Sequence, residues 1–223
     1  MSLRKLSYLQ KLHANSRVAA GGDLYDDLIE RTQNAVSRAF SKADLASVGL
    51  QTDEDLKSRI DQILKAGVVW ANATTFVSRH AYFFSSAPRL LQETVPKKLK
   101  TLLSDPHFKV SLAETIRTQM LSHLAPFEQD PASMTNIALT AAVEATSHAA
   151  TKAISKAKPD LLLAPPASGD AESNANKLAY GCVMHFLRLW ITGGHGGPSM
   201  AATMAILGPY VCRQRLSEQK SLD

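Results

Sequence analysis

Apolar residues recur at the spacing of an α-helix along nearly the whole chain, and this pattern limits the fold more than any other feature of the sequence. Two clear stripes are formed by Leu24, Leu28, Ile29, Val36 and Phe40, and by Leu56, Ile60, Ile63 and Leu64. Alternating Val, Ile and Thr runs between tight hairpin turns, which would indicate β-strands, do not occur in the sequence. We therefore expect an all-α protein built as a helical bundle or cage.

Cap and turn residues predict where several helices begin and end. Thr52 precedes three acidic residues, a typical helix start, and Gly67 predicts the end of that helix. Ser104-Asp105-Pro106 predicts the start of a helix that runs from Pro106 to Leu124, because Asp can cap and Pro fits the first turn. Further helices are expected over Leu90–Leu103, from a cap at Ser133 to about Lys156, over Asn174–Ile191, over Pro198–Leu207, and from about Pro209.

Proline positions and shifts in composition predict the domain organisation. Residues 1–50 are expected to form a helical connector, residues 51–125 a first helical subdomain and residues 126–223 a second. Pro126 and Pro131 bracket the hinge between the two subdomains. The Pro-rich stretch at about 158–173 is expected to be an exposed loop or insertion.

The modest excess of basic residues suits partners that carry phosphate without requiring them. The 223 residues include 25 Lys and Arg against 20 Asp and Glu, for a net charge of +5, and the sequence pI is near 9.2. Cys182 and Cys212 are too few for a disulfide framework and are expected to be buried thiols. No apolar run is long enough for a membrane span, so a membrane is not an expected partner. DNA is not an expected partner either.

The sequence shows no pattern typical of a catalytic or metal site. The 7 histidines are scattered, and none has the His-Glu-x-x-His spacing that places two metal ligands on one helical face. Ser147-His148 near Glu144 lacks the nucleophile elbow of a hydrolase. Because no P-loop and no strand–glycine loop–helix unit occur either, we expect neither catalytic residues nor metal ligands nor a cofactor in this chain.

The most specific motif lies near the carboxyl end. It consists of Leu187-Arg188 and Thr192-Gly193, a glycine-rich stretch, Gly197-Pro198-Ser199-Met200, then Leu207-Gly208 and Arg215-Leu216. This ending resembles the C-terminus of bacterial and organellar-type glutamyl-tRNA synthetases. Two weaker likenesses to the same family, Lys5–His13 and Leu56–Ile60 with Tyr82-Phe83-Phe84 downstream, occur in the same order as in that family.

The resemblance implies an α-helical cage that receives the anticodon stem and loop of glutamate tRNA. The parent enzyme charges this tRNA with glutamate by means of ATP and Mg²⁺, but its His-x-Gly-His-like and Lys-Met-Ser-Lys-like signatures do not occur here. The chain is thus similar to the tRNA-binding half alone, and we expect no activity without a catalytic domain supplied in cis or in trans. The insertion at 158–173 favours an organellar enzyme in the mitochondrial matrix, with the cytoplasm as the place of a bacterial one.

The resemblance also implies a set of tRNA-binding residues, each with a plainer alternative. The candidates are Arg188, Thr192, Gly197, Ser199, Arg117, Arg213, Arg215, Lys57 and Arg59. Arg188 matches the arginine of the family motif, and a guanidinium can pair with phosphate or stack on a base. The alternatives are a surface arginine at Arg188, a turn-capping hydroxyl at Thr192, a tight helix-to-helix turn at Gly197 and Ser199, and solvated charges at the remaining arginines and the lysine.

Weaker candidates come from the rest of the chain. Arg79-His80 and the lysines at 97, 98 and 100 are candidates for phosphate contacts, and Phe83 and Phe84 could stack bases but fit a core role better. As an alternative function, the chain is a helical protein-interaction module that no longer binds tRNA.

Overall fold

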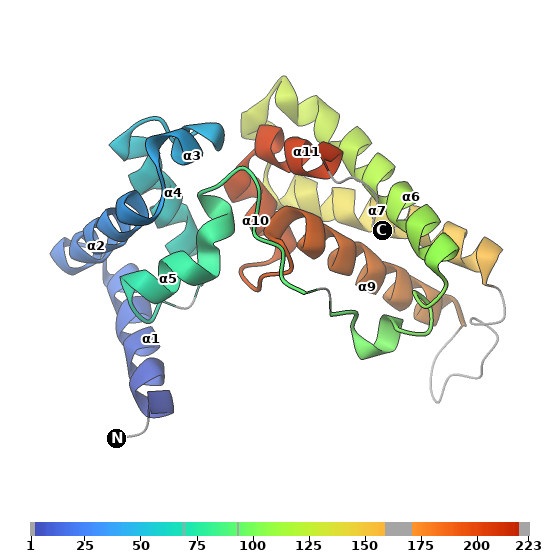
Figure 1. Ribbon diagram of the computed structural model, residues 1–223, viewed down its shortest axis with the longest axis horizontal. Helices are drawn as coiled ribbons and strands as arrows, with labels where there is room; N and C mark the ends of the chain where they lie inside the picture. Colours follow the sequence, from blue (N-terminus) through green and yellow to red (C-terminus); the bar gives the residue numbers. More distant parts are fainter. Residues whose placement is uncertain (1–2, 69, 93, 159–170, 219–223) are drawn as a thin grey trace. The chain divides into compact units, whose positions relative to one another are not determined.

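The computed structural model describes residues 3–68, 70–92, 94–158 and 171–218, and within these ranges it is an α-helical protein without strands, which confirms the expected fold class (Figure 1). The α-helices are α1 Leu3–Ala20, α2 Asp23–Ala39, α3 Lys42–Ser47, α4 Asp53–Lys65, α5 Ala73–His80, α6 Pro106–Leu124, α7 Asn136–Ala157, α9 Ala171–Thr192, α10 Met200–Leu207 and α11 Pro209–Glu218. The 3-10 turns are η1 Ala81–Phe83, η2 Lys97–Leu99, η3 Ala125–Glu128 and η4 Pro131–Ser133.

Local capping residues explain several of these boundaries. The Thr52 hydroxyl accepts the Asp55 N–H and the Asp55 carboxylate accepts the Thr52 N–H, a capping box that starts α4. Asp105 accepts the N–H of Phe108 with Pro106 in the first turn, so α6 begins and ends where the sequence predicts. Thr135, rather than the expected Ser133, caps α7.

The helix expected over Leu90–Leu103 does not form. In the described part of this stretch, helical structure is confined to the 3-10 turn η2. Pro96 explains the difference, because it lacks an N–H and disfavours a helical conformation in the residue before it. The Leu91 N–H donates to the carbonyl of Gly193 at 2.9 Å, so this N–H is bonded to another segment of the chain and not within a helix.

The chain forms two compact units that are discontinuous in sequence. Unit 1 comprises residues 1–89 and 195–207, and unit 2 comprises residues 90–194 and 208–223. The division into a helical connector at 1–50 and two anticodon-binding subdomains at 51–125 and 126–223 stays a prediction. Most of the expected insertion at 158–173 lies outside the described residues, and α9 begins at Ala171, before the predicted end of that insertion.

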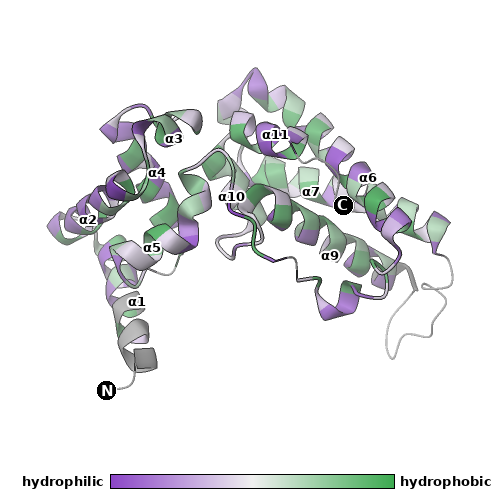
Figure 2. Cartoon of the chain, viewed as in Figure 1, coloured by the Kyte–Doolittle hydropathy of each residue, from purple (hydrophilic) through white to green (hydrophobic). Residues whose placement is uncertain are grey.

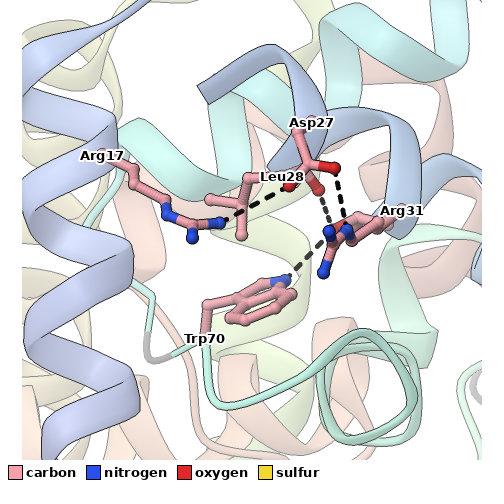
Figure 3. A network of polar contacts seen from close by, with 6 residues as sticks. Arg17, Asp27, Leu28, Arg31 and Trp70 are labelled. Carbon is pink, nitrogen blue, oxygen red and sulfur yellow. Dashed lines mark hydrogen bonds and ion pairs between the residues drawn. The ribbon is translucent and has the colours of Figure 1, made fainter. Parts of the chain in front are cut away.

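Unit 1 is held together by an aromatic core and by polar contacts around α2. Phe76, Phe83 and Phe84 are fully buried, which confirms a core role for the aromatic group. Figure 3 shows Asp27 of α2 between Arg17 at 3.6 Å and Arg31 at 2.8 Å. The Trp70 indole donates to the Thr32 hydroxyl at 3.0 Å and ties the segment after α4 to α2. Of the expected α2 stripe, Leu24 is 61 % exposed in the first turn of the helix and does not join the buried face.

Unit 2 is built on three long helices, α6, α7 and α9, that lie side by side, with α11 packed on α6 and α9 (Figure 1). Small residues such as Ala142, Ala150 and Ala179 are buried and let the helix backbones approach closely. Figure 2 shows hydrophobic residues along α9 and hydrophilic ones on the turn at η2. The thiols of Cys182 and Cys212 are buried as expected, and burial raises the pKa of Cys182 to about 12.

Candidate nucleic-acid interface

Arg188 lies on the last turns of α9 and is partly exposed. Its side chain lines a hollow of about 350 Å³ in unit 2. One wall of the hollow is α9 itself, and the other is the segment that runs from Leu91 to Pro96. A guanidinium at the edge of a hollow is planar and always charged, so it is suited to pair with phosphate or to stack on a base.

The end of α9 is fixed by several hydrogen bonds that also shape this hollow. Gly193 and Gly194 have φ values of 68° and 86°, which favour glycine. Their N–H groups donate to the carbonyls of Leu189 and Arg188 at 3.0 and 3.1 Å, so they satisfy the last turn of the helix. The bond from Leu91 to the Gly193 carbonyl then holds the facing segment against this end.

Arg215 requires a correction to the sequence-based expectation. Its side chain is 1 % exposed, and its guanidinium donates to the carbonyl of Ile191 at the end of α9. Buried in this way, it cannot contact the phosphate of an RNA in this structure. Its role is structural, because a cation at a helix C-terminus satisfies a terminal carbonyl and opposes the negative end of the helix dipole.

Thr192 is also buried, at 1 % exposure, and its hydroxyl donates to the Arg188 carbonyl at 2.8 Å. This position corrects the expectation of an RNA contact and fits the capping alternative. Arg117 and Arg213 are partly exposed, and they form ion pairs with Glu114 at 2.6 Å and with Glu128. An RNA contact through either arginine stays a prediction, in which a phosphate would compete with the carboxylate.

The remaining candidates lie in unit 1. Ser199 is exposed and caps α10, because its hydroxyl accepts the Ala202 N–H at 3.2 Å. Gly197 is exposed and is required by close packing, since a Cβ at this position would lie 2.1 Å from the Tyr82 hydroxyl. Lys57 is exposed on α4, whereas Arg59 is partly buried and donates to the Val48 carbonyl at 3.3 Å. The structure thus places Arg188 and Gly197 in different units.

Unit 1 contains a second hollow, of about 390 Å³, that sequence reasoning did not predict. It is lined by Gly67, Val68, Arg79, His80, His195, Gly196 and Gly197. His80 is 4 % exposed, and burial, with Arg79 and His195 nearby, lowers its pKa to about 4. An accessible phosphate contact through His80 is therefore not supported, whereas Arg79 is exposed. No local sequence signal could reveal that His80 and His195 line one hollow, because the two residues lie in distant parts of the chain.

The described part of the chain holds neither a metal-binding cluster nor a membrane-spanning helix. Among the side chains that the structure describes, no group of three or more His, Cys, Asp and Glu could hold a metal ion. Within the same part of the chain, none of the helices is both long and apolar enough to cross a membrane.

Comparison with known proteins identifies the family. No curated protein and no solved structure matched the chain. Residues 72–220, more than half of the chain, match the family model described as the anticodon binding domain. The match begins at Asn72, the N-cap of α5, and contains α9, the hollow at Arg188 and the glycine turn that follows. The chain therefore belongs to the family of anticodon-binding domains, the part of a tRNA synthetase that binds tRNA.

Proposed function

We propose that this chain binds the anticodon stem and loop of glutamate tRNA as part of a bacterial-type glutamyl-tRNA synthetase. The family supports tRNA binding in general. The finer proposal of glutamate tRNA depends on the carboxyl-terminal motif around Arg188 and Pro198.

The observation that carries the proposal is the position of Arg188. It is partly exposed on a helix end that three neighbouring hydrogen bonds hold, and it borders a hollow with polar and apolar walls. RNA loops are read by splayed bases that stack on planar groups and bond to side chains, and a positioned guanidinium can do both. Positioning also lowers the conformational entropy that binding would cost.

The rest of the reaction belongs to a catalytic half. The sequence has no phosphate-binding loop for ATP, and the motifs that hold ATP in the family that this chain resembles do not occur in it. We therefore assign ATP, Mg²⁺ and the joining of glutamate to that half, whether it is in the same chain or a partner. We further propose the mitochondrial matrix as the location, with the cytoplasm as the alternative for a bacterial protein.

The substitution Arg188→Ala tests the proposal. We expect it to weaken binding of glutamate tRNA by about 1–3 kcal/mol, the range for loss of a good base contact, with little change in the midpoint of thermal unfolding. Binding is measured by fluorescence anisotropy at low salt, with a tRNA of unrelated anticodon as competitor. Arg38→Ala, which removes an exposed arginine of α2, is the matched control.

Two results would contradict the proposal. Equal affinity of the wild-type chain for both tRNAs would favour the protein-interaction alternative. A fall in unfolding free energy as large as the loss of binding would instead assign Arg188 a structural role.

A further inference from the structure

A row of cationic side chains continues from Arg188 along unit 2. The turn at η2 carries Lys97 and Lys98, Lys100 follows it, and all three are exposed. Figure 1 shows the segment before and through η2 running beside α9. Pro96, the residue before this turn, also lines the hollow at Arg188, so the three lysines follow one wall of that hollow along the chain.

A close contact packs the turn at η2 against α9. Leu99 points inward and is 4 % exposed. Its side chain rests on Gly181, where an added Cβ would lie 3.3 Å from the Leu99 Cδ2 atom. Glycine in a helix interior is destabilising relative to alanine, so its use here fits a need for close approach. The position of the lysines is thus set by packing.

The helix α9 contributes its own exposed residues to the same row. Lys177 is exposed and Tyr180 is 48 % exposed, both before Gly181 in the helix. At 1.5 Å of rise per residue, Lys177 and Arg188 are separated by about 16 Å along the axis. Since the charges of one nucleic-acid strand repeat about every 3.4 Å along its axis, the row is long enough for several phosphates.

We propose that Lys97, Lys98, Lys100 and Lys177 form a phosphate-binding strip that holds the backbone of the RNA stem without reading its sequence. This inference rests on the proposed function and divides the work between two parts of one surface. Arg188, with its planar fork, reads the loop, while the lysines hold the stem, because a lysine ammonium acts on phosphate as a point charge.

The composition of the strip favours RNA over a protein partner. Lysine is depleted at the centres of protein interfaces, which are rich in aromatic and other apolar residues. Among the residues that the structure describes, none that lines the adjoining hollow is acidic. An acidic protein is the competing occupant, and in that case removal of the lysines would leave the salt dependence of tRNA binding unchanged.

The test is the double variant Lys97→Gln and Lys98→Gln in the full chain. Affinity is measured between 50 and 200 mM salt, an interval over which phosphate contacts dominate the change, for glutamate tRNA and for the same tRNA with an altered anticodon. We expect the slope of log affinity against log salt to fall by roughly 1.5, since each phosphate contact contributes about 0.7–0.9. The fall should be equal for both RNAs, so the ratio of their affinities is unchanged.

The matched control is Lys152→Gln with Lys156→Gln, which removes the same charge from two exposed lysines of α7. An equal effect of the control pair would overturn the strip, because the effect would then come from net charge. A changed ratio between the two RNAs would overturn it as well, since the lysines would then read sequence. An unchanged slope, with the wild type still preferring glutamate tRNA, refutes the strip alone and leaves an acidic protein as its occupant. If the wild type shows no preference but the lysine pair still lowers the slope, the proposed function fails and the strip stands.

Discussion

At the scale of single residues, the burial of His80 predicts how folding stability depends on pH. Its pKa is lowered from 6.5 to about 4 by burial against the aromatic core and, to a lesser extent, by Arg79 and His195. Between pH 4 and 6.5 the unfolded chain therefore binds more protons at His80 than the folded chain does. The contribution of His80 to folding stability is fully present above pH 6.5 and is lost as the pH falls toward 4. The pKa difference corresponds to about 3 kcal/mol. Urea unfolding at a series of pH values measures it.

The variant His80→Phe isolates this contribution. It keeps an aromatic ring in the core and removes the titrating group, so its stability should change less than that of the wild type between pH 6.5 and 4. His148→Gln changes an exposed histidine and should keep the wild-type curve. If the free energy of unfolding of His80→Phe changed with pH as much as that of the wild type, His80 would not be the cause of the pH dependence.

At the scale of elements, the end of α9 depends on α11 through Arg215. In Arg215→Met the Ile191 carbonyl loses its charged donor, and an unsatisfied buried polar group costs about 1–3 kcal/mol. Because Arg188 extends from the same turns, we expect tRNA affinity to fall as well. Chemical unfolding and tRNA titration measure the two effects.

A double-mutant cycle separates positioning from general destabilisation. If Arg215 acts by placing Arg188, then Arg215→Met should weaken tRNA binding much less in the Arg188→Ala background. Arg215→Lys, which keeps a cation, should recover part of the affinity. Fully additive losses of binding would show that the two residues act independently.

The sequence predicts elements well where local chemistry decides them and poorly where tertiary contacts do. Thr52 and Asp105 cap α4 and α6 as predicted, because a cap depends on neighbouring residues. The apolar pattern of Leu90–Leu103 predicts a helix that Pro96 and the bond to Gly193 prevent.

The candidate site follows the same division. The motif identifies the turn around Arg188, but burial of Arg215 depends on how α11 packs on α9, which spacing along the chain does not encode. The lysines at 97, 98 and 100 are visible in the sequence as charges. Their position beside α9 depends on Gly181, whose role emerges only from the packing of Leu99.

At the scale of the whole molecule, the two ends of the chain should differ in how much they stabilise it. The helix α1 contacts α2, and its ion pair to Asp27 is partly exposed, a kind of pair worth about 0.2–1 kcal/mol. Its Tyr8 and Leu12 are 62 % and 46 % exposed. The helix α11 instead buries Val211, Cys212 and Leu216 in unit 2.

We therefore expect removal of residues 1–20 to leave tRNA affinity within roughly threefold, because Arg188 and its supports all belong to unit 2. Removal of residues 208–223 should abolish specific binding and broaden the thermal transition, since each large buried side chain contributes about 1.5–3 kcal/mol. Circular dichroism and tRNA titration on both truncated chains provide the measurement. If the chain without residues 208–223 kept a sharp transition and wild-type affinity, α11 would be dispensable. The support of Arg188 would then have to come from the glycine turn and the segment at Leu91 alone.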